Sequence, residues 1–547
     1  MFYRFLNSQT KTVISSAGIL AVFSLLSRFL GLIRDRLLAA SFGAGQEMDI
    51  YTAAFRVPDL VYNILIAGGI VVAFLPLFSE YFLKDKEEGW KMVNCVLNVF
   101  LFLLILCSSI LFILAPWLIE FIVPGFDVSS KVLTITLTRL MLLSPIFFGI
   151  SSIFSGILHY FNRFLAYSLA PVVYNLGIIS GILFFAPYNN WGIFGVGLGV
   201  VLGAFLHLAI QIIPAFNCGF RYKPVLDFKY PAIRKIFTLM IPRTIAIASQ
   251  QINLIVITAI ASTITTGSIA VFYYSNNIQH LPIGIIGVSF ATATFPLLSK
   301  TWANGQKKEF LQGLSSSFRQ ILFLIIPASA LMYLLRAQII RIILGTGQFG
   351  WWETRLTSAC LGVFCLSIFA TALIPLVARA FFAFQDTKTP TLISVISVAF
   401  NIVLSFAFVW LLQFPNLFYG FIKNALRLQG IEDISVVGLP LAFSIATIFQ
   451  LTLLLLFLYK KIGDLDIKEI SYSFLKIILA TLIMSGGAYS VLYLTALFLN
   501  TRTFLGIFFQ AGIAGVIGVL IYITVTLLLK SQEAKAFKHL ILKKLHC

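Results

Sequence analysis

Charge is scarce in this chain, and acidic charge is scarcest. Only 11% of the 547 residues are charged, and 20 acidic residues stand against 39 basic ones. Hydrophobic residues make up 59% of the sequence, and the mean hydropathy is +0.98. A soluble protein of this length cannot bury so much apolar surface. The composition therefore excludes a soluble fold and predicts a polytopic membrane protein.

The sequence also lacks the patterns that carry most enzyme chemistry. Its six cysteines are scattered and form no disulfide or metal-binding pattern. We find no HExxH, GxSxG or Walker A motif, so we expect no catalytic site, no cofactor and no metal site. The net charge of +19 does not indicate nucleic-acid binding, because Lys and Arg lie mainly in short loops and in the C-terminal tail.

Apolar windows of about 20 residues predict an all-α protein with about fourteen transmembrane helices. These helices begin near Ile14, Ile50, Val93, Val132, Leu165, Trp191, Ile233, Ser268, Phe318, Thr357, Thr391, Val436, Ser471 and Phe504. The first apolar run is too long for a cleavable signal sequence, so we expect it to stay as the first span. Basic residues gather in every second connection, which predicts that both termini lie in the cytoplasm.

The chain repeats itself at an offset of about 220 residues. The segment AFLPLFSEYFLKDKEEGWKMV from Ala73 resembles ATFPLLSKTWANGQKKEFLQG from Ala293, and LAPWLIEFIVPGFD from Leu114 resembles LRAQIIRIILGTGQF from Leu335. The offset spans six helices, so both halves share one orientation, as in transporters built from parallel repeats. We expect an N-lobe of helices 1–6 (residues 1–228) and a C-lobe of helices 7–12 (229–462). Residues 463–547 would form helices 13 and 14 and a basic tail.

The first predicted span carries four charged residues, Arg28, Arg34, Asp35 and Arg36. One charge at the centre of a lipid-facing helix costs about 2.5–3.5 kcal/mol. At about 100° per residue, the polar and small side chains fall on one arc: Ser24, Ser27, Arg28, Gly31, Arg34 and Asp35. The pattern predicts a helix with one lipid-facing side and one cationic side that faces a cavity. Arg36 would reach the membrane interface.

Other predicted spans also carry polar side chains. In the second helix, one arc holds Asp49, Thr52, Arg56, Asp59 and Asn63. In the seventh, Arg243 aligns with Gln250 and Asn253, and the eighth contains Asn277 and His280. Arginine exceeds carboxylate in this set. Because Arg binds phosphate through paired N–H donors, the excess indicates an anionic ligand such as a phosphate or pyrophosphate.

A purely structural interpretation of these residues stays open. Arg28 with Asp35, and Arg56 with Asp49 or Asp59, are candidate ion pairs that would only hold helices together. Asp49 and Asp59 also lie where a carboxylate caps a helix. A lone histidine such as His280 is either a proton site or an ordinary polar residue.

Several segments resemble one family. The stretch SLLSRFLGLIRDRLLAASFGAGQEMDIYTAAFRVPDL from Ser24 resembles the opening of the MurJ/MviN lipid II flippases, in the multidrug/oligosaccharidyl-lipid/polysaccharide exporter superfamily. Three later segments are similar to the same family: LLSPIFFGISSIFSGILHYFNRFLAYSLAPVVYNLG from Leu142, IIRIILGTGQF from Ile339, and ARAFFAFQDTKTPTLISVISVAFNIVLS from Ala378. The resemblance covers helices 1–12.

The resemblance implies two six-helix lobes around a cavity, and two final helices that form a groove for a lipid tail. It implies alternating access that moves undecaprenyl-pyrophosphate-linked peptidoglycan precursor, lipid II, from the inner to the outer leaflet of a bacterial cytoplasmic membrane. The partners would be lipid II or a similar lipid, membrane lipids and cell-wall synthesis proteins. Coupling to the membrane potential or to a monovalent cation is a further expectation.

The family's site positions fall on named residues here. Its first-helix basic and Arg-Asp positions fall on Arg28, Arg34 and Asp35, its next acidic position on Asp49, and its second-helix basic position on Arg56. The expected substrate-binding set is Arg28, Arg34, Arg56, Asn63, Arg243 and Asn277. The expected gating or charge-pairing set is Ser24, Asp35, Asp49 and His280.

The chain departs from the family at two places. Many members carry an Arg pair and a Glu in the second helix, where this chain has Tyr62, Asn63 and Ala67. Many carry Arg and Glu in the eighth helix, where it has Asn277 and His280. Each departure removes basic and acidic groups together, and Arg243 is a candidate to compensate for the lost arginines.

Four alternatives remain open. One is a flippase for another polyprenyl-pyrophosphate-linked glycan, and another is a non-transporting member of the fold. A multidrug exporter is disfavoured, because cationic drugs would favour an acidic cavity. A membrane glycosyltransferase or acyltransferase would need a catalytic carboxylate such as Asp386, which fits better as a loop residue.

Overall fold

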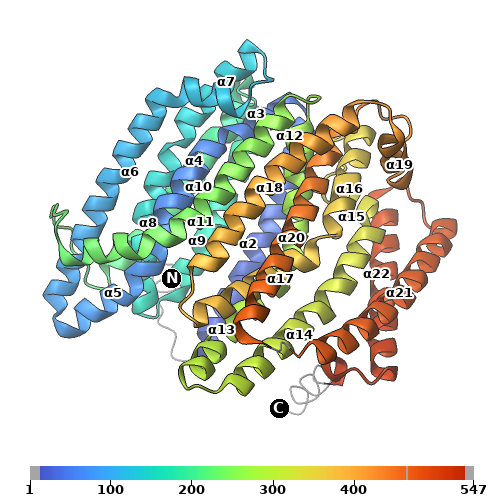
Figure 1. Cartoon of the computed structure of the whole chain (residues 1–547). Coiled ribbons are helices and arrows are strands. Elements are labelled where there is room, and N and C mark those ends of the chain that lie inside the picture. The colour runs from blue at the N-terminus through green and yellow to red at the C-terminus, as the bar shows by residue number, and fades with distance from the viewer. Residues whose placement is uncertain (1–12, 464–465, 536–547) are drawn as a thin grey trace. The chain divides into compact units, whose positions relative to one another are not determined.

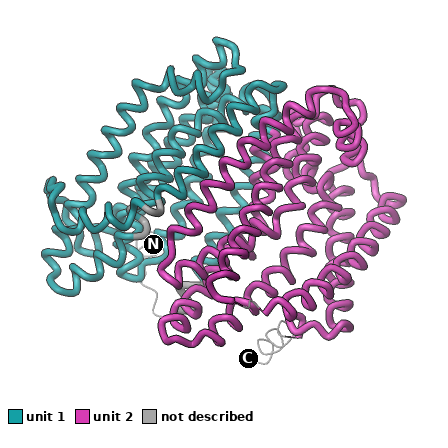
Figure 2. Tube along the Cα trace, in the orientation of Figure 1, with its two compact units in different colours: residues 1–270 teal, residues 271–547 magenta. Residues whose placement is uncertain are grey.

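The computed structural model describes residues 13–463 and 466–535, and within that part the chain is helical and contains no strand (Figure 1). It forms two compact units, residues 1–270 and residues 271–547 (Figure 2). Twelve helices in the described residues are long and apolar enough to cross a membrane. A thirteenth span is a helix pair bent by 45°, α16 (Trp351–Cys365) and α17 (Ile368–Ala383). The predicted count of fourteen also includes the charged first helix, which is not among these spans.

Unit 1 begins with one long helix and continues with a broken second span. Its elements are α2 (Val13–Phe42), α3 (Gln46–Ala54), α4 (Arg56–Val61), the π-helix η1 (Tyr62–Ile70), α5 (Val71–Lys84), α6 (Lys86–Ile122), α7 (Val128–Met141), α8 (Leu143–Tyr160), α9 (Phe164–Ser180), the π-helix η2 (Gly181–Phe185), the 3-10 helix η3 (Tyr188–Asn190), α10 (Ile193–Phe216) and α11 (Pro231–Ser262). The π-helix η1 changes the angular spacing of side chains along the second span.

Helix α9 and the π-helix η2 that continues it pack against α10 at backbone contact. A Cβ on Gly177 would lie 2.3 Å from the Cα of Gly203, and one on Gly181 would lie 2.7 Å from the Cα of Gly199. Glycine at these positions lets the two helices approach closely, as small residues do in membrane helix pairs. The contact fixes α9, which carries Asn175, relative to α10, which carries His207.

Unit 2 repeats part of this plan. Its elements are α12 (Ser268–Pro282), which begins at the unit boundary, the π-helix η4 (Ile283–Gly287), α13 (Val288–Ala303), α14 (Lys307–Leu334), α15 (Arg336–Ile343), α16, α17, α18 (Lys388–Gln413), α19 (Leu417–Ala425), the 3-10 helix η5 (Ser435–Val437), α20 (Gly438–Ile462), α21 (Ile467–Phe498) and α22 (Phe504–Leu528). The order π-helix, proline-containing helix, long helix occurs in both units, with Pro76 inside α5 and Pro296 inside α13. The structure thus carries the repeat seen in the sequence.

The last two helices are tied to unit 2 by charge. Arg319 of α14 lies 3.3 Å from Glu469 of α21 and 3.3 Å from Glu533, which follows α22. The buried Glu533 also accepts a hydrogen bond from Ser473 of α21 at 3.0 Å. Buried charges require partners, and this cluster holds α21 against α14.

The compact units divide at a different place from the predicted lobes. The boundary lies between Ala270 and Val271, so α11, predicted to open the C-lobe, packs within unit 1. A Cβ on Gly68 of η1 would lie 3.0 Å from the Thr244 hydroxyl of α11, which shows how closely these elements approach. The division into compact units does not test the repeat symmetry, so the predicted lobe boundaries at residues 228 and 462 stay a prediction.

Candidate functional site

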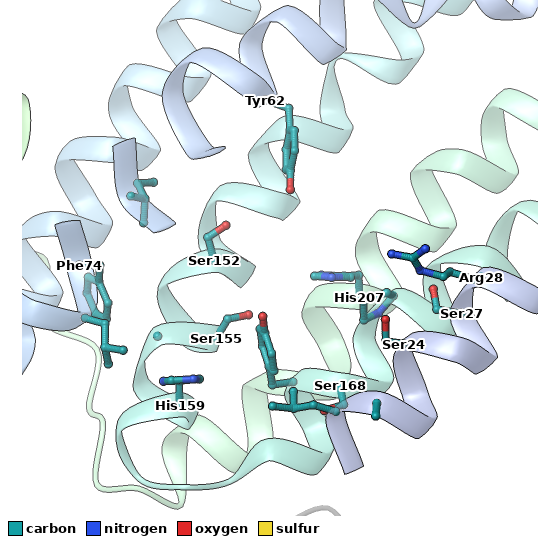
Figure 3. Close-up of a pocket in the computed structure, with 17 residues that line it drawn as sticks. Ser24, Ser27, Arg28, Tyr62, Phe74, Ser152, Ser155, His159, Ser168 and His207 are labelled. Atoms are coloured by element: carbon teal, nitrogen blue, oxygen red, sulfur yellow. The ribbon is translucent and has the colours of Figure 1, made fainter. Parts of the chain in front are cut away.

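Unit 1 contains a cavity of about 960 Å³. Its walls come from α2, η1, α5, α8, α9 and α10. Ser24, Ser27 and Arg28 of α2 line one side, and Ser152, Ser155 and His159 of α8 line another (Figure 3). The described lining residues all belong to unit 1, and none of them is acidic. We refer to this space as the main cavity.

Arg28 is the one charged side chain among the described residues that line the main cavity. It is half-buried, and it makes no hydrogen bond or ion pair with the described residues. Outside the polar arc of the same helix, Leu25 is 59% exposed and Phe29 is 61% exposed. This arrangement confirms the prediction that α2 has an apolar side and a cationic side facing a cavity. Arg28 is therefore available for an anionic ligand.

Arg34 and Asp35 are held in a network beside the main cavity. Arg34 donates from Nε (3.0 Å) and Nη2 (2.8 Å) to Oδ1 of Asp35, and from Nη1 (3.2 Å) to Oδ1 of Asn175. Asn175 in turn donates to the Ser27 hydroxyl at 3.2 Å. Asp35 thus pairs with its neighbour Arg34 and not with Arg28. Neither residue lines the main cavity, and their network anchors α2 to α9.

Asp49 ties two connecting segments together. Its buried carboxylate accepts hydrogen bonds from the backbone N–H groups of Gly267, at 2.6 Å, and Ala270, at 2.8 Å. These groups lie at the start of α12, where a carboxylate is favoured. Gly267 has φ of +91°, and a Cβ there would lie 2.0 Å from the Ala44 carbonyl oxygen, so glycine is required. We call this contact of Asp49 with Gly267 and Ala270 the Asp49 clasp.

The second span does not present one polar arc, because it is broken at Phe55 and widened by η1. Arg56 is buried and donates from Nε to the Thr258 hydroxyl of α11 at 2.8 Å. Asn63 donates to the backbone carbonyl of Asp59 at 2.9 Å. Neither Arg56 nor Asn63 lines the main cavity, and their role in substrate binding stays a prediction.

Three predicted residues lie elsewhere. Arg243 falls within α11, but its side chain lies outside the part that the structure describes. Asn277, half-buried, and His280, exposed, belong to α12 in unit 2.

Helices α8 and α10 carry a polar network at the main cavity that the sequence did not single out. His207 of α10 bonds through Nδ1 to the Ser151 hydroxyl of α8 at 2.7 Å. Gln211 donates to the same hydroxyl at 2.8 Å and accepts from the Ser155 hydroxyl at 2.6 Å. The pairs Ser151/Ser155 and His207/Gln211 are each four residues apart, which places both members on one helix face. That spacing was a signal available in the sequence.

A family model described as "Lipid II flippase MurJ" matches residues 38–510. The chain belongs to this family. A probable lipid II flippase MurJ from Rhizobium tropici is 31% identical over 402 residues, covering 72% of this chain and 74% of the relative. One from Vibrio cholerae serotype O1 is 27% identical over 431 residues, covering 76% and 80%. Family membership confirms the resemblance and makes the chain a multi-pass inner-membrane protein.

Solved structures agree with this assignment. A lipid II flippase MurJ in an inward closed conformation aligns with a TM-score of 0.73 and 27% identity, covering 93% of this chain and 97% of that one. An inward-facing multidrug resistance transporter of the MATE family aligns with a TM-score of 0.62 and 15% identity, covering 80% and 95%. The second likeness concerns the fold alone. Together they confirm the predicted fold class.

Proposed function

We propose that this chain is a lipid II flippase, which moves undecaprenyl-pyrophosphate-linked peptidoglycan precursor from the inner to the outer leaflet of the cytoplasmic membrane by alternating access. The observation that supports this most directly is the main cavity, which contains Arg28 and no described acidic lining residue. A membrane-embedded arginine without a protein partner is costly. A pyrophosphate would supply the missing negative charge and accept paired N–H bonds from the guanidinium.

Neighbouring hydroxyl groups on α2 fit the same ligand. Ser24 and Ser27 lie beside Arg28, and Ser27 accepts from Asn175, which leaves its hydroxyl hydrogen to donate to a phosphate oxygen without adding charge. Ser152 and Ser155 face them from α8 (Figure 3), but these hydroxyls donate to the Phe148 carbonyl and to Gln211. Arg34 and Asp35 act on this set indirectly, since Asn175 connects Arg34 to Ser27.

Both termini are proposed to lie in the cytoplasm, in line with the basic loops. In that orientation the main cavity, at the N-terminal half of α2 and the C-terminal half of α8, lies toward the cytoplasm. The Asp49 clasp follows α2 and therefore lies toward the outer side. A cavity that is accessible from the cytoplasm is the state in which a flippase receives its substrate.

The membrane potential is a suitable energy source for this direction of movement. Each elementary charge that crosses contributes about 2.3 kcal/mol per 100 mV. A pyrophosphate-linked lipid is anionic, so a negative interior favours its outward movement. We propose transport without catalysis by the chain itself, and cell-wall synthesis proteins that consume lipid II as its protein partners.

Binding by the purified protein distinguishes lipid II from the related substrates. We expect lipid II to displace a fluorescent lipid II analogue from the full chain more effectively than a polyprenyl pyrophosphate carrying another glycan. Undecaprenyl monophosphate, which lacks one phosphate, should compete least because Arg28 then meets fewer acceptor oxygens. Equal competition by both glycans would favour the broader alternative, and no binding of any of them would contradict the proposal.

A further inference from the structure

A second, smaller cavity of about 320 Å³ lies in unit 1 next to the main cavity. The two spaces share Tyr62, Pro171 and His207 as lining residues, so these side chains form the partition between them. The smaller cavity is also lined by Asp59 of α4 and Ser144 of α8. We call it the Asp59 chamber.

Two polar groups in the Asp59 chamber lack hydrogen-bond partners. The Asp59 carboxylate makes no hydrogen bond or ion pair with the described residues, although Arg56 attracts it electrostatically. Arg56 directs its Nε to Thr258 instead. The Ser144 hydroxyl is buried, with the residue 4% exposed, and it has no partner among the described residues. A buried hydroxyl without a partner is costly, and so is a half-buried carboxylate in a membrane span that no side chain bonds, so the chamber is built to hold something polar.

The chemistry of the walls favours a proton over a larger cation. Besides Asp59, the described residues that line the chamber with side-chain oxygens are Ser144 and two tyrosines, and the other described lining residues are mainly proline, phenylalanine and methionine. Metal cations bound through oxygen require several such ligands at once. His207 places a proton-accepting imidazole in the same wall. A carboxylate in this setting is best neutralised by a proton.

We propose that Asp59 is the proton-binding site of this transporter, and that protons reach it from the main cavity past Tyr62 and His207. The inference rests on the proposed transport function and adds the coupling ion and its place. The step is simple: the carboxylate takes one proton from water and releases it again, and no other bond changes. The titratable or charged groups around the chamber are Arg56, Tyr62, Tyr174 of α9 and His207 of α10.

Protonation would change how α4 is held. The ionised carboxylate attracts Arg56, while Arg56 also bonds to Thr258 of α11. Neutralising Asp59 removes the first interaction and leaves the second. Helix α11 leads directly into the segment whose N–H groups bond to Asp49. The charge on Asp59 therefore shifts the balance between a formed and a broken Asp49 clasp.

Infrared difference spectra of the full chain in proteoliposomes, recorded between acidic and alkaline buffer, test the site without requiring transport. We expect a carbonyl band of a protonated carboxylic acid that Asp59→Asn removes. Asp386→Asn serves as the matched control, since Asp386 is a loop carboxylate 2.7 Å from the Lys461 amine. Partial burial opposes its ionisation, but hydrogen bonds from Lys461 and Thr389 outweigh this and lower the pKa of Asp386. Its removal should leave the band unchanged.

The outcomes separate the inference from the proposed function. The inference is overturned if Asp59→Asn leaves the spectrum unchanged. It is also overturned if the carbonyl band appears only when sodium is replaced by choline at constant pH. If circular dichroism shows that Asp59→Asn does not fold, Asp59→Glu takes its place. This variant keeps the carboxyl group and should shift the band. Lipid II flipping is measured separately in the same vesicles. An intact band in a chain that does not flip lipid II contradicts the proposed function alone.

Discussion

Replacing Arg28 with alanine is expected to reduce lipid II binding and flipping by on the order of 100-fold, because a charge-assisted hydrogen bond contributes about 1.5–3 kcal/mol and each 1.4 kcal/mol is about tenfold. Arg28 is the one charged side chain among the described lining residues of the main cavity, so no neighbouring described charge there can replace it. The measurement is displacement of a fluorescent lipid II analogue from purified protein, together with flipping in proteoliposomes.

Two variants control for the loss of charge itself. Arg139→Ala also removes an arginine from unit 1, but Arg139 bonds to the Phe112 carbonyl at 3.1 Å and lies outside the main cavity. It should bind lipid II as the unaltered chain does. Arg28→Lys keeps the charge without the paired donors and should bind at an intermediate level. Normal binding by Arg28→Ala would contradict the proposed pyrophosphate contact.

Replacing Asp49 with alanine is expected to destabilise the protein by about 2–5 kcal/mol, because it leaves two buried N–H groups without acceptors. These are the N–H groups of Gly267 and Ala270 at the start of α12. Asp49→Asn keeps one acceptor oxygen and should lose less. The measurement is thermal unfolding of the purified full chain, with flipping in proteoliposomes as the functional readout.

Asp127 offers a matched control for this loss. It caps α7 from an exposed position, where hydrogen bonds from Ser129 and Ser130 hold the pKa of its carboxyl well below the usual range. Water can replace the bonds of an exposed cap, so Asp127→Ala should unfold close to the unaltered chain. Equal losses for Asp49→Ala and Asp127→Ala would show that the Asp49 clasp is no more than an ordinary cap.

The sequence predicted α2 well because this helix is regular. A period of about 100° per residue requires an unbroken α-helix, and α2 runs from Val13 to Phe42 without interruption. Ser24 and Arg28 therefore lie on the cavity side, as expected. What periodicity could not show is that Arg34 reaches its own neighbour Asp35 and Asn175 of α9, since such pairing depends on the packing of another helix.

The same reasoning failed on the second span because that span is not one α-helix. The break at Phe55 and the π-helix from Tyr62 to Ile70 shift every later side chain relative to a regular period. As a result Asp49, Arg56 and Asp59 have three different environments. Glycine and proline in this span allowed for irregularity, but they did not reveal its kind or place.

The polar network of α8 and α10 was missed for a different reason. His207, Ser151 and Gln211 lie in apolar helices, and a polar residue in such a helix is most simply interpreted as part of the packing. Their contacts join α8 to α10 across 56 or more positions, and only the fold brings them together. The four-residue spacing within each helix was the one local signal.

The most direct test of the account is a rescue measurement in bacteria whose own lipid II flippase can be switched off. Externalised lipid II is quantified after expression of the unaltered chain, Arg28→Ala and Arg139→Ala, with each protein's membrane level matched. The account predicts that the unaltered chain and Arg139→Ala restore export and that Arg28→Ala does not. A well-expressed, membrane-inserted chain that restores no export would contradict the assignment as a lipid II flippase.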